Sequence, residues 1–314
     1  MLHTLPDARH SPTTLIRLAY DTFGARTNVP LFLIMGLGAQ RIFWEDGFCQ
    51  LLAERGFWVI RFDNRDAGES TSIADKLTPS LLQLAASGLF GAHVPIPYTL
   101  LDMADDVVNL MARLNVPKAH IVGASMGGMI AQMLAIHHPQ KVLSLTSIMS
   151  SNGNKNLHKP TTEVLRKLLK PMPKERDTCI ARGIDFWRTL HGHFYSFDFL
   201  QTSKLMNQAF DRGLNPQGVL RQFAAILAAK DRTLALSQLM LPTLVIHGDA
   251  DPMLPVSNAY ATANAIPGAK LGIHSGMGHT LPFQLWPVII DDIAELALSA
   301  SDLNRKYDGL KQVR

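Results

Sequence analysis

Cysteine is scarce in this chain of 314 residues. The two cysteines, Cys49 and Cys179, lie far apart, and neither belongs to a CxxC pair. A disulfide framework or a cysteine-ligated zinc site needs more thiols at closer spacing. We therefore expect two reduced thiols and no zinc site. No other feature of the sequence implies a metal or an organic cofactor.

Long apolar runs are missing as well. No stretch reaches the roughly 18 residues that a membrane-spanning helix needs. The opening segment, MLHTLPDARHSPTT, has polar residues and prolines where a secretory signal would carry an apolar core. These absences predict a cytoplasmic protein without a membrane span.

The basic residues form no run with interleaved aromatic residues. The chain holds 30 Lys and Arg against 26 Asp and Glu, a formal net charge of +4 at pH 7. A nucleic-acid surface needs basic residues gathered in one tract or on one face. The sequence therefore argues against a nucleic-acid partner. Its hydrophobic fraction of 47% is typical of a globular protein with a sizeable core.

Short apolar runs alternate with segments of helical periodicity along much of the chain. A segment at 14–20 alternates apolar and polar residues, which predicts an antiparallel strand at a sheet edge. This rhythm is typical of a doubly wound α/β sheet. The predicted buried strands lie at 31–36, 57–63, 119–124, 142–148 and 243–249, and the predicted helices at 44–55, 99–114, 126–138 and 281–299.

The rhythm breaks between residues 151 and 238. This stretch has helical patterns punctuated by prolines, and no run in it is typical of a buried strand. We therefore expect an α/β core in two parts, 1–150 and 239–314. Residues 151–238, referred to below as the insertion, are expected to be helical.

A serine stands between two glycines in the stretch IVGASMGGM, residues 121–129. A GxSxG pattern arises by chance in about one chain in ten of this length, so its context matters more than its letters. Here Ser125 ends a predicted strand and precedes a predicted helix, the setting of a nucleophile elbow. In so tight a turn, side chains at 123 and 127 would collide with neighbouring segments. The pattern therefore indicates a serine nucleophile.

A serine hydroxyl needs a base and an orienting acid to become nucleophilic. His279 follows two glycines on a predicted loop after a short apolar run, a suitable place for the base. Two acids follow the strand at 243–249. Asp249 could instead bond nearby backbone, and Asp251 lies further out on the loop beside Pro252, so the residues alone leave both candidates open.

An oxyanion also needs backbone donors. The N–H of Met126 follows the nucleophile directly, and a second donor is expected from the loop that reads Met35-Gly36-Leu37-Gly38. Four other acidic residues are interpreted as turn or helix-surface positions. They are Asp66, Asp102, Asp105 and Asp106.

These motifs resemble the α/β-hydrolase superfamily, and the resemblance covers nearly the whole chain. GASMG, HGDADPMLP and GMGHTLP follow the family's order of serine, acid and histidine. The resemblance implies Ser125 as nucleophile, Asp251 as acid and His279 as base. It also implies that the N–H groups of Leu37 and Met126 bind the oxyanion.

Two further segments carry the resemblance. FDNRDAGES resembles the family's DxRGxGxS signature with Asp66 in place of a glycine, and MGLG resembles its HGxG loop with Met35 in place of histidine. With the GxSMG elbow, these forms are most similar to the aclacinomycin methylesterase-like and lipase/esterase branch. The resemblance implies an α/β-hydrolase fold in which residues 151–238 form a helical cap.

The function that the resemblance implies is a carboxylic ester hydrolase that works through an acyl-enzyme. Residues 185–200 hold six aromatic residues, which predicts an apolar pocket wall and a preference for short to medium apolar esters. The same triad serves carbon–carbon bond hydrolases, lactonases and perhydrolases, and these alternatives stay open. Ser125 argues against dehalogenases and epoxide hydrolases of this fold, which use aspartate. An intact triad also disfavours a ligand receptor of negligible turnover.

Overall fold

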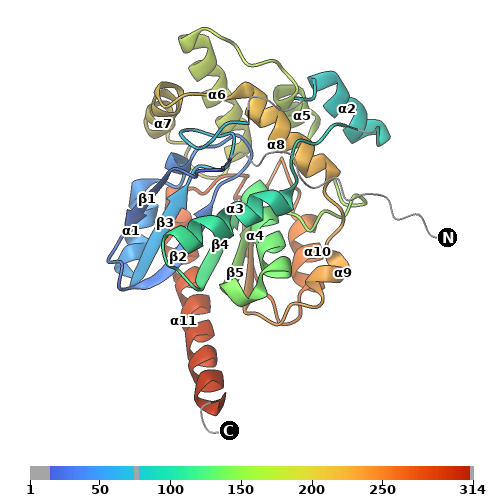
Figure 1. Ribbon diagram of the computed structural model, residues 1–314. Coiled ribbons are helices and arrows are strands. Elements are labelled where there is room, and N and C mark those ends of the chain that lie inside the picture. Colours follow the sequence, from blue (N-terminus) through green and yellow to red (C-terminus); the bar gives the residue numbers. More distant parts are fainter. Residues whose placement is uncertain (1–14, 74–77, 93, 312–314) are drawn as a thin grey trace, which may run out of the picture.

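The computed structural model describes residues 15–73, 78–92 and 94–311. Its centre is a seven-stranded sheet of order β1-β3-β2-β4-β5-β6-β7, in which β1 is antiparallel and the other strands are parallel (Figure 1). This confirms the predicted doubly wound, mostly parallel α/β sheet. The strands are β1 (Tyr20–Phe23), β2 (Val29–Ile34), β3 (Phe57–Phe62), β4 (Ala119–Ala124), β5 (Val142–Ile148), β6 (Thr243–Gly248) and β7 (Lys270–His274).

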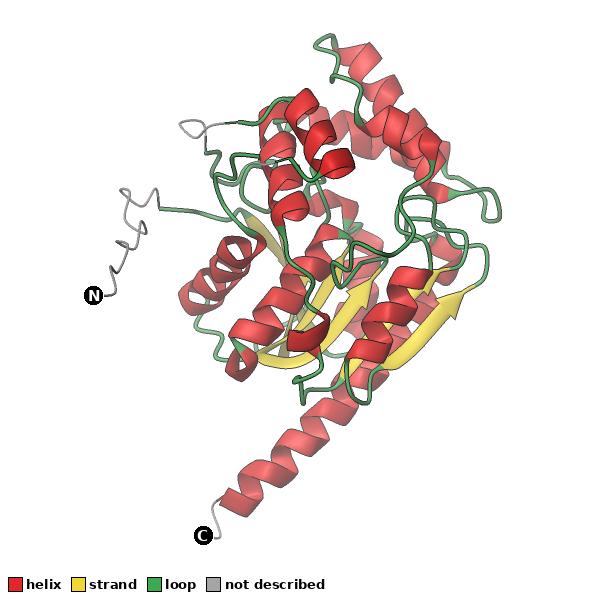
Figure 2. Cartoon of the chain, turned by 90° about the vertical axis from the view of Figure 1, so that its right-hand side faces the viewer, coloured by secondary structure: helices red, strands yellow, loops and turns green. Residues whose placement is uncertain are grey.

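Helices cover both faces of the sheet (Figure 2). Along β2, Phe32 and Ile34 pack into one apolar cluster, while Leu31 and Leu33 pack into the cluster on the opposite face. A strand buried on both faces needs apolar residues at every position, which is why the run is continuous. The covering helices are α3 (Leu100–Arg113), α4 (Met126–His137) and α10 (Ser257–Ala265) on the first face, and α1 (Asp46–Glu54) and α11 (Trp286–Lys311) on the second.

The edge strand does not lie where the alternating pattern predicted it. The antiparallel strand is β1, with Tyr20 opposite Phe62, rather than residues 14–20. Residue 14 lies outside the described part of the chain. Residues 15–19 run beside the loop after β3 instead, where Ala19 accepts a hydrogen bond from the Asp63 N–H at 2.9 Å. Because β3 ends at Phe62, no strand remains there for these residues to pair with.

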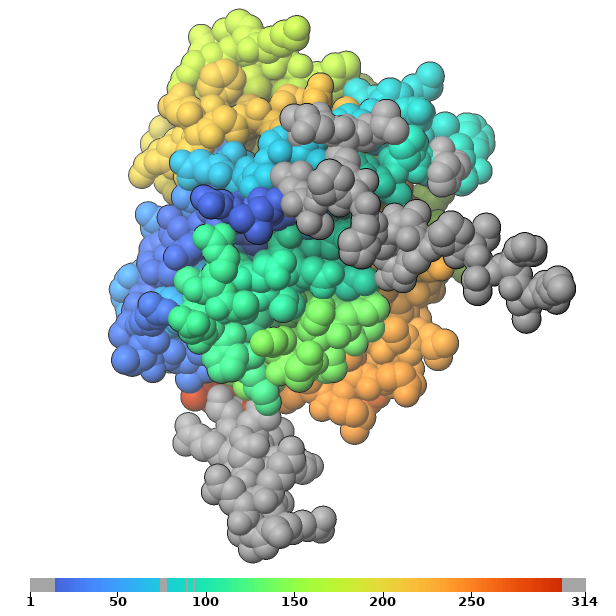
Figure 3. Space-filling model, viewed as in Figure 1, coloured from blue at the N-terminus to red at the C-terminus, as the bar shows by residue number. Residues whose placement is uncertain are grey.

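The insertion is helical, and α2 (Leu81–Phe90), which the sequence pattern did not predict, packs on its α8. Leu84 of α2 and Ala224 of α8 belong to one buried apolar cluster, which Val94, beyond the end of α2, also joins. Figure 3 shows most of the insertion, in yellow-green to orange, above the sheet domain. Within residues 151–238 the helices are α5 (Thr162–Leu168), α6 (Arg176–His191), α7 (Phe199–Asp211), α8 (Pro216–Ala228) and α9 (Thr233–Leu236), and no strand is assigned there.

The last helix extends well beyond the sheet. The C-terminal half of α11 projects away from the body in both views (Figures 1 and 2). No helix among the described residues is both long and apolar enough to cross a bilayer. Three short 3-10 helices complete the fold: η1 (Arg41–Phe43), η2 (Pro139–Lys141) and η3 (Phe283–Leu285).

Candidate active site

Ser125 occupies the turn between β4 and α4 with a positive φ of 56° and a ψ of −121°. A residue with a Cβ adopts this region only under constraint. Two hydrogen bonds supply the constraint: the Ser125 N–H donates to the Ile148 carbonyl at 2.9 Å, and the Ser150 hydroxyl donates to the Ser125 carbonyl at 2.7 Å. The end of β5 therefore fixes the serine backbone.

The glycines around Ser125 are required by close approach of backbone segments. A Cβ on Gly123 would lie 2.2 Å from the Gly127 carbonyl oxygen, and one on Gly127 would lie 2.0 Å from the Ile34 carbonyl oxygen. Neither distance is possible between real atoms, because backbone cannot move aside as a flexible side chain can. The prediction that positions 123 and 127 need glycine is therefore confirmed.

His279 lies on the loop between β7 and α11, with one ring nitrogen facing the serine and the other facing an acid. Its Nε2 is 2.9 Å from Ser125 Oγ, and its Nδ1 is 2.7 Å from Asp251 Oδ2. An ionised carboxylate only accepts, so Nδ1 carries the hydrogen and Nε2 accepts from the serine hydroxyl. The structure thus brings three predicted residues into one hydrogen-bonded chain.

Asp251 is buried, and hydrogen bonds occupy both of its oxygens. Oδ1 accepts from the backbone N–H groups of Met253 and Leu254, each at 2.8 Å. Burial alone would raise the pKa of this carboxyl. The neighbouring His279 and His247 outweigh burial and hold the pKa of Asp251 below its usual range. The acid is therefore ionised, as the orientation of His279 requires.

Asp249 has a different role in the structure. It is exposed, and its Oδ1 accepts a hydrogen bond from the Gly276 N–H at 2.6 Å. This bond joins the turns that follow β6 and β7. Of the two acids that the residues left open, Asp251 is the one that contacts His279.

His247 is a neighbour of the acid that the sequence analysis did not single out. Its side chain is fully buried, and its Nε2 lies 2.7 Å from the Leu254 carbonyl oxygen and 3.2 Å from Asp251 Oδ2. A carbonyl only accepts, so Nε2 carries the hydrogen. Its position four residues before Asp251, in the same motif, was the signal available in the sequence.

The loop after β2 passes close to the serine. A Cβ on Gly36 would lie 3.1 Å from the Ser125 Cβ and 3.6 Å from its Oγ. Leu37, next along this loop, lines the same cavity as Ser125. Met126 follows the serine as the first residue of α4. The two expected backbone donors therefore belong to two segments that both lie close to Ser125.

A cavity of about 870 Å³ opens above Ser125 and His279. Three of the six aromatic residues in 185–200 line it, namely Phe186, Trp187 and Phe197, while Phe194 and Phe199 are exposed. The Trp187 ring stacks on Phe43 at 4.7 Å between centroids. Other apolar lining residues include Leu37, Trp44, Phe48, Leu205, Val219 and Trp286.

Charged groups at the cavity wall are mostly engaged with other protein groups. Lys167 pairs with Asp185 at 2.8 Å, and Arg182 donates to backbone carbonyls at and just after the C-terminal end of α5. Burial raises the pKa of Glu45, which accepts a hydrogen bond from Gln201. In the described part of the chain, no three His, Cys, Asp or Glu side chains gather as metal ligands.

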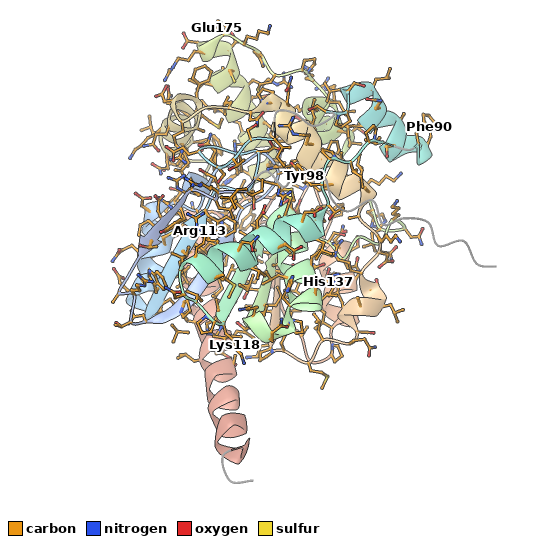
Figure 4. All side chains as sticks on the ribbon, viewed as in Figure 1. Phe90, Tyr98, Arg113, Lys118, His137 and Glu175 are labelled. Atoms are coloured by element: carbon orange, nitrogen blue, oxygen red, sulfur yellow. The ribbon has the colours of Figure 1, made fainter. Side chains whose placement is uncertain are left out.

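Two of the four acidic residues interpreted as turn or helix-surface positions have buried side chains, which corrects the helix-surface interpretation of Asp106 and adds a buried partner to the turn position of Asp66. Asp106 pairs with Arg65 at 2.6 Å. Asp66 does sit in a turn, with a φ of 67°, but its side chain is fully buried against Arg221 at 2.6 Å. The Tyr98 hydroxyl, marked in Figure 4, also donates to it at 2.8 Å. Burial raises the pKa of Asp66, but these donors outweigh it and lower the pKa overall.

The other two acidic residues match their interpretation more closely. Asp102 accepts from the Thr99 N–H at 2.7 Å and so caps α3, and Asp105 pairs with His138 at 2.7 Å. Both are helix residues near the surface. The buried pairs were missed because their partners lie far away in the sequence: Arg221 is 155 residues from Asp66.

Comparisons with known proteins agree with the observed fold. A family model described as alpha/beta hydrolase fold matches residues 29–284. Rhodomycin D methylesterase DnrP from Streptomyces peucetius is 26% identical over 287 residues, covering 85% of this chain and 90% of that protein. 3-Oxoadipate enol-lactonase 2 from Acinetobacter baylyi is 24% identical over 247 residues, covering 77% and 79%. The crystal structure of a hydrolase from Pseudomonas aeruginosa shares the fold, with a TM-score of 0.64 at 24% identity, covering 90% and 93%.

Proposed function

This chain belongs to the α/β-hydrolase family and is a hydrolase, and we propose that it cleaves carboxylic esters through a serine-bound acyl-enzyme. The predicted resemblance to this superfamily is confirmed. The observation that supports the proposed reaction is the hydrogen-bonded chain of Ser125, His279 and Asp251 at the base of an apolar cavity. A relative named as a methylesterase supports the same chemistry.

In the acylation step, Ser125 Oγ attacks the carbonyl carbon of the ester while His279 Nε2 takes its proton. The carbonyl oxygen becomes an anion, and the N–H groups of Leu37 and Met126 stabilise it. His279 then gives the proton to the alkoxide leaving group. The alcohol departs and the acyl group remains on Ser125.

Water completes the reaction. His279 takes a proton from a water molecule, whose oxygen attacks the acyl carbon, and the proton then returns to Ser125 Oγ as the carboxylic acid leaves. The ionised Asp251 stabilises the imidazolium that forms in each step and keeps Nδ1 as the donor. The low pKa of Asp251 suits this role, because the acid stays charged throughout.

The substrate class follows from the cavity. Its wall is largely apolar, so an apolar acyl or alcohol group gains roughly 0.8 kcal/mol for each buried CH₂. The charged side chains at the wall are mostly paired, so they offer little to an anionic substrate. We therefore propose apolar esters of short to medium length, with the insertion acting as a cap that sets the preference.

Lactone hydrolysis is the second candidate. A lactone is a cyclic ester, so the same attack, proton transfer and deacylation would open it. The similarity to a protein named as an enol-lactonase supports this candidate. A substrate panel with linear p-nitrophenyl esters and lactones of equal carbon number distinguishes the two by the ratio of their kcat/KM values.

Trapping with a fluorophosphonate tests the proposed reaction. We expect one adduct, on the peptide that carries Ser125, with esterase activity lost in proportion to labelling. Ser125→Ala should lower kcat by roughly 10⁵–10⁶ and His279→Ala by a similar factor, while the double variant is little worse, because the residues act as a unit. Labelling elsewhere, or an active Ser125→Ala variant, would contradict the proposal.

A further inference from the structure

The loop that carries Leu37 is held by a residue of the insertion. The Gly38 N–H, one residue beyond Leu37, donates to the side-chain Oε1 of Gln222 at 2.8 Å. Gln222 belongs to α8, 184 residues away in the sequence, and its side chain is fully buried. A buried polar side chain normally has a hydrogen-bond partner within the protein. Here the partner is the backbone of the loop, so Gln222 holds that loop in place.

The other end of the Gln222 amide is fixed as well. Its Nε2 donates to the Arg65 carbonyl at 2.8 Å. Arg65 is itself held by Asp106, which accepts from its guanidinium at 2.6 and 2.7 Å. A flipped amide would place two donors together at Gly38 and two acceptors together at Arg65. Gln222 therefore has one orientation, and it joins the loops after β2 and β3.

Packing on α8 reinforces the bond. Val219, three residues before Gln222 and on the same helix face, lies against Gly38: a Cβ on Gly38 would be 2.8 Å from Val219 Cγ2. Gly38 has a φ of 66°, a conformation that glycine adopts without strain. A hydrogen bond and a van der Waals contact from one helix thus set where the loop lies relative to Ser125.

We propose that Gln222 is a positioning residue that places the Leu37 N–H for the oxyanion. The inference rests on the proposed function, because it assigns a task within that reaction. The Leu37 N–H interacts with negative charge that develops only in the transition state. Displacement of the loop therefore reduces the stabilisation of the transition state and leaves substrate binding in the ground state intact. Removing such a donor costs about 10²–10³ in kcat, and displacing it should cost about 10- to 100-fold.

The test uses Gln222→Met, which keeps the length of the side chain and removes both hydrogen bonds. We expect kcat for p-nitrophenyl butanoate to fall about 10- to 100-fold with little change in KM. The inhibition constant of an arylboronic acid, whose tetrahedral serine adduct places an anionic oxygen at the donors, should rise in parallel. That of a non-hydrolysable ether analogue of the substrate should not change.

Gln132→Met is the matched control. Gln132 lies in α4, is also fully buried, and bonds at both ends, to Arg232 at 3.0 Å and to Ser147 at 3.3 Å. It shares no hydrogen bond with the loop at 36–38. Its replacement should lower the melting temperature while kcat and the boronate constant stay within about twofold, because the lost bonds are structural only.

Two results would overturn the proposal. One is a kcat loss in Gln222→Met no greater than that in Gln132→Met; the other is an equal weakening of boronate and ether binding. If Gln222→Met does not fold, Gln222→Asn keeps the site polar but is too short to reach both partners, and the same expectations and overturning results apply to it. Failure of the proposed function is distinguishable, because it would appear in the wild type as no Ser125 labelling.

Discussion

α6 and α7 differ from α8 in how they attach to the sheet, although all three lie between β5 and β6. α8 places Arg221 and Gln222, 1% and 0% exposed, among the polar loops that follow β2 and β3. α6 and α7 pack on each other and carry an exposed ion pair, Arg176 with Asp211 at 2.9 Å. Their bonds to the sheet loops lie at or near the helix ends, where the Leu190 carbonyl accepts from the His279 N–H and the Ala209 carbonyl accepts from Gln40 Nε2. Their shared apolar cluster consists of Ile180, Ile184 and Met206.

The two modes of attachment have different physical consequences. Apolar contacts are non-directional, so the middle of α6 and of α7, which such contacts hold, can repack when the ligand changes. Buried hydrogen bonds and ion pairs are directional and costly to break, so α8 has one position. We infer that the insertion combines an adaptable wall, formed by the apolar middle of α6 and α7, and a fixed support, α8.

The largest expected effect concerns the acid of the proposed triad, which lies on a sheet loop and belongs to neither part of the insertion. Asp251→Asn should lower kcat by about 10⁴, because an amide cannot hold His279 in the tautomer that accepts from Ser125. Asp249→Asn, which removes only a bond between turns, should cost less than about tenfold. Steady-state kinetics on one ester compares them. A larger loss for Asp249→Asn would reverse the assignment of the acid.

The next largest effect is a difference in the free energy of unfolding between a variant in α8 and a variant in α6. Arg221→Met leaves the buried Asp66 without its ionic partner and should lower the free energy of unfolding by about 3 kcal/mol. Arg176→Met breaks an exposed pair instead and should cause no measurable change. Urea unfolding followed by tryptophan fluorescence gives both values. Equal losses would mean that the two parts of the insertion are attached alike.

A pH series refines the same contrast. The pKa of Asp66 lies below its ordinary value in the fold, so its charged pair contributes stability above the unfolded pKa of about 3.9 and loses it as pH falls through the folded pKa. The stability difference between wild type and Asp66→Asn should therefore be full at pH 6 and shrink towards pH 3. A flat difference for Asp66→Asn would contradict the expectation.

The smallest effect tests the adaptable wall. Trp187→Leu shortens the wall where Trp187 stacks on Phe43. The ratio of kcat/KM for the octanoate ester to that for the butanoate ester of p-nitrophenol should fall by about fourfold, which corresponds to the loss of one buried methylene. The kcat/KM for the acetate ester should change little. Leu234→Ala, an exposed change on α9, should leave the ratio unaltered. An unchanged ratio in Trp187→Leu would exclude this wall from chain-length selection.

The sequence predicted the parts of the site that local chemistry determines. Buried strands show as continuous apolar runs, and the turn at Ser125 shows as paired glycines, because each constraint acts within a few residues. Chain order and loop position then gave His279, and the resemblance gave Asp251. The structure brings these residues within hydrogen-bond distance of one another.

The sequence did not predict features that depend on partners far along the chain. In the sequence, Asp66 looks like an ordinary turn aspartate, and only the structure shows Arg221 beside it. Gln222 likewise looks like an ordinary helix glutamine, and only the structure shows its bond to Gly38. The edge strand was predicted too early in the chain. Alternation at 14–20 indicates a half-buried segment, but it does not indicate whether a neighbouring strand extends far enough to pair with it. α2 was missed although the sequence carries a local signal for its start, the capping box of Ser80 with Gln83.

The positive φ of Ser125 has a consequence for how this protein can change. The serine is held in a region of conformational space that glycine enters freely, at a cost of about 1 kcal/mol or more for other residues. Ser125→Gly would relieve this backbone strain and, at the same time, remove the hydroxyl group. Selection for thermostability alone therefore leads away from catalysis at this position. Ser125, the proposed nucleophile, is a point of local frustration that only selection for activity maintains.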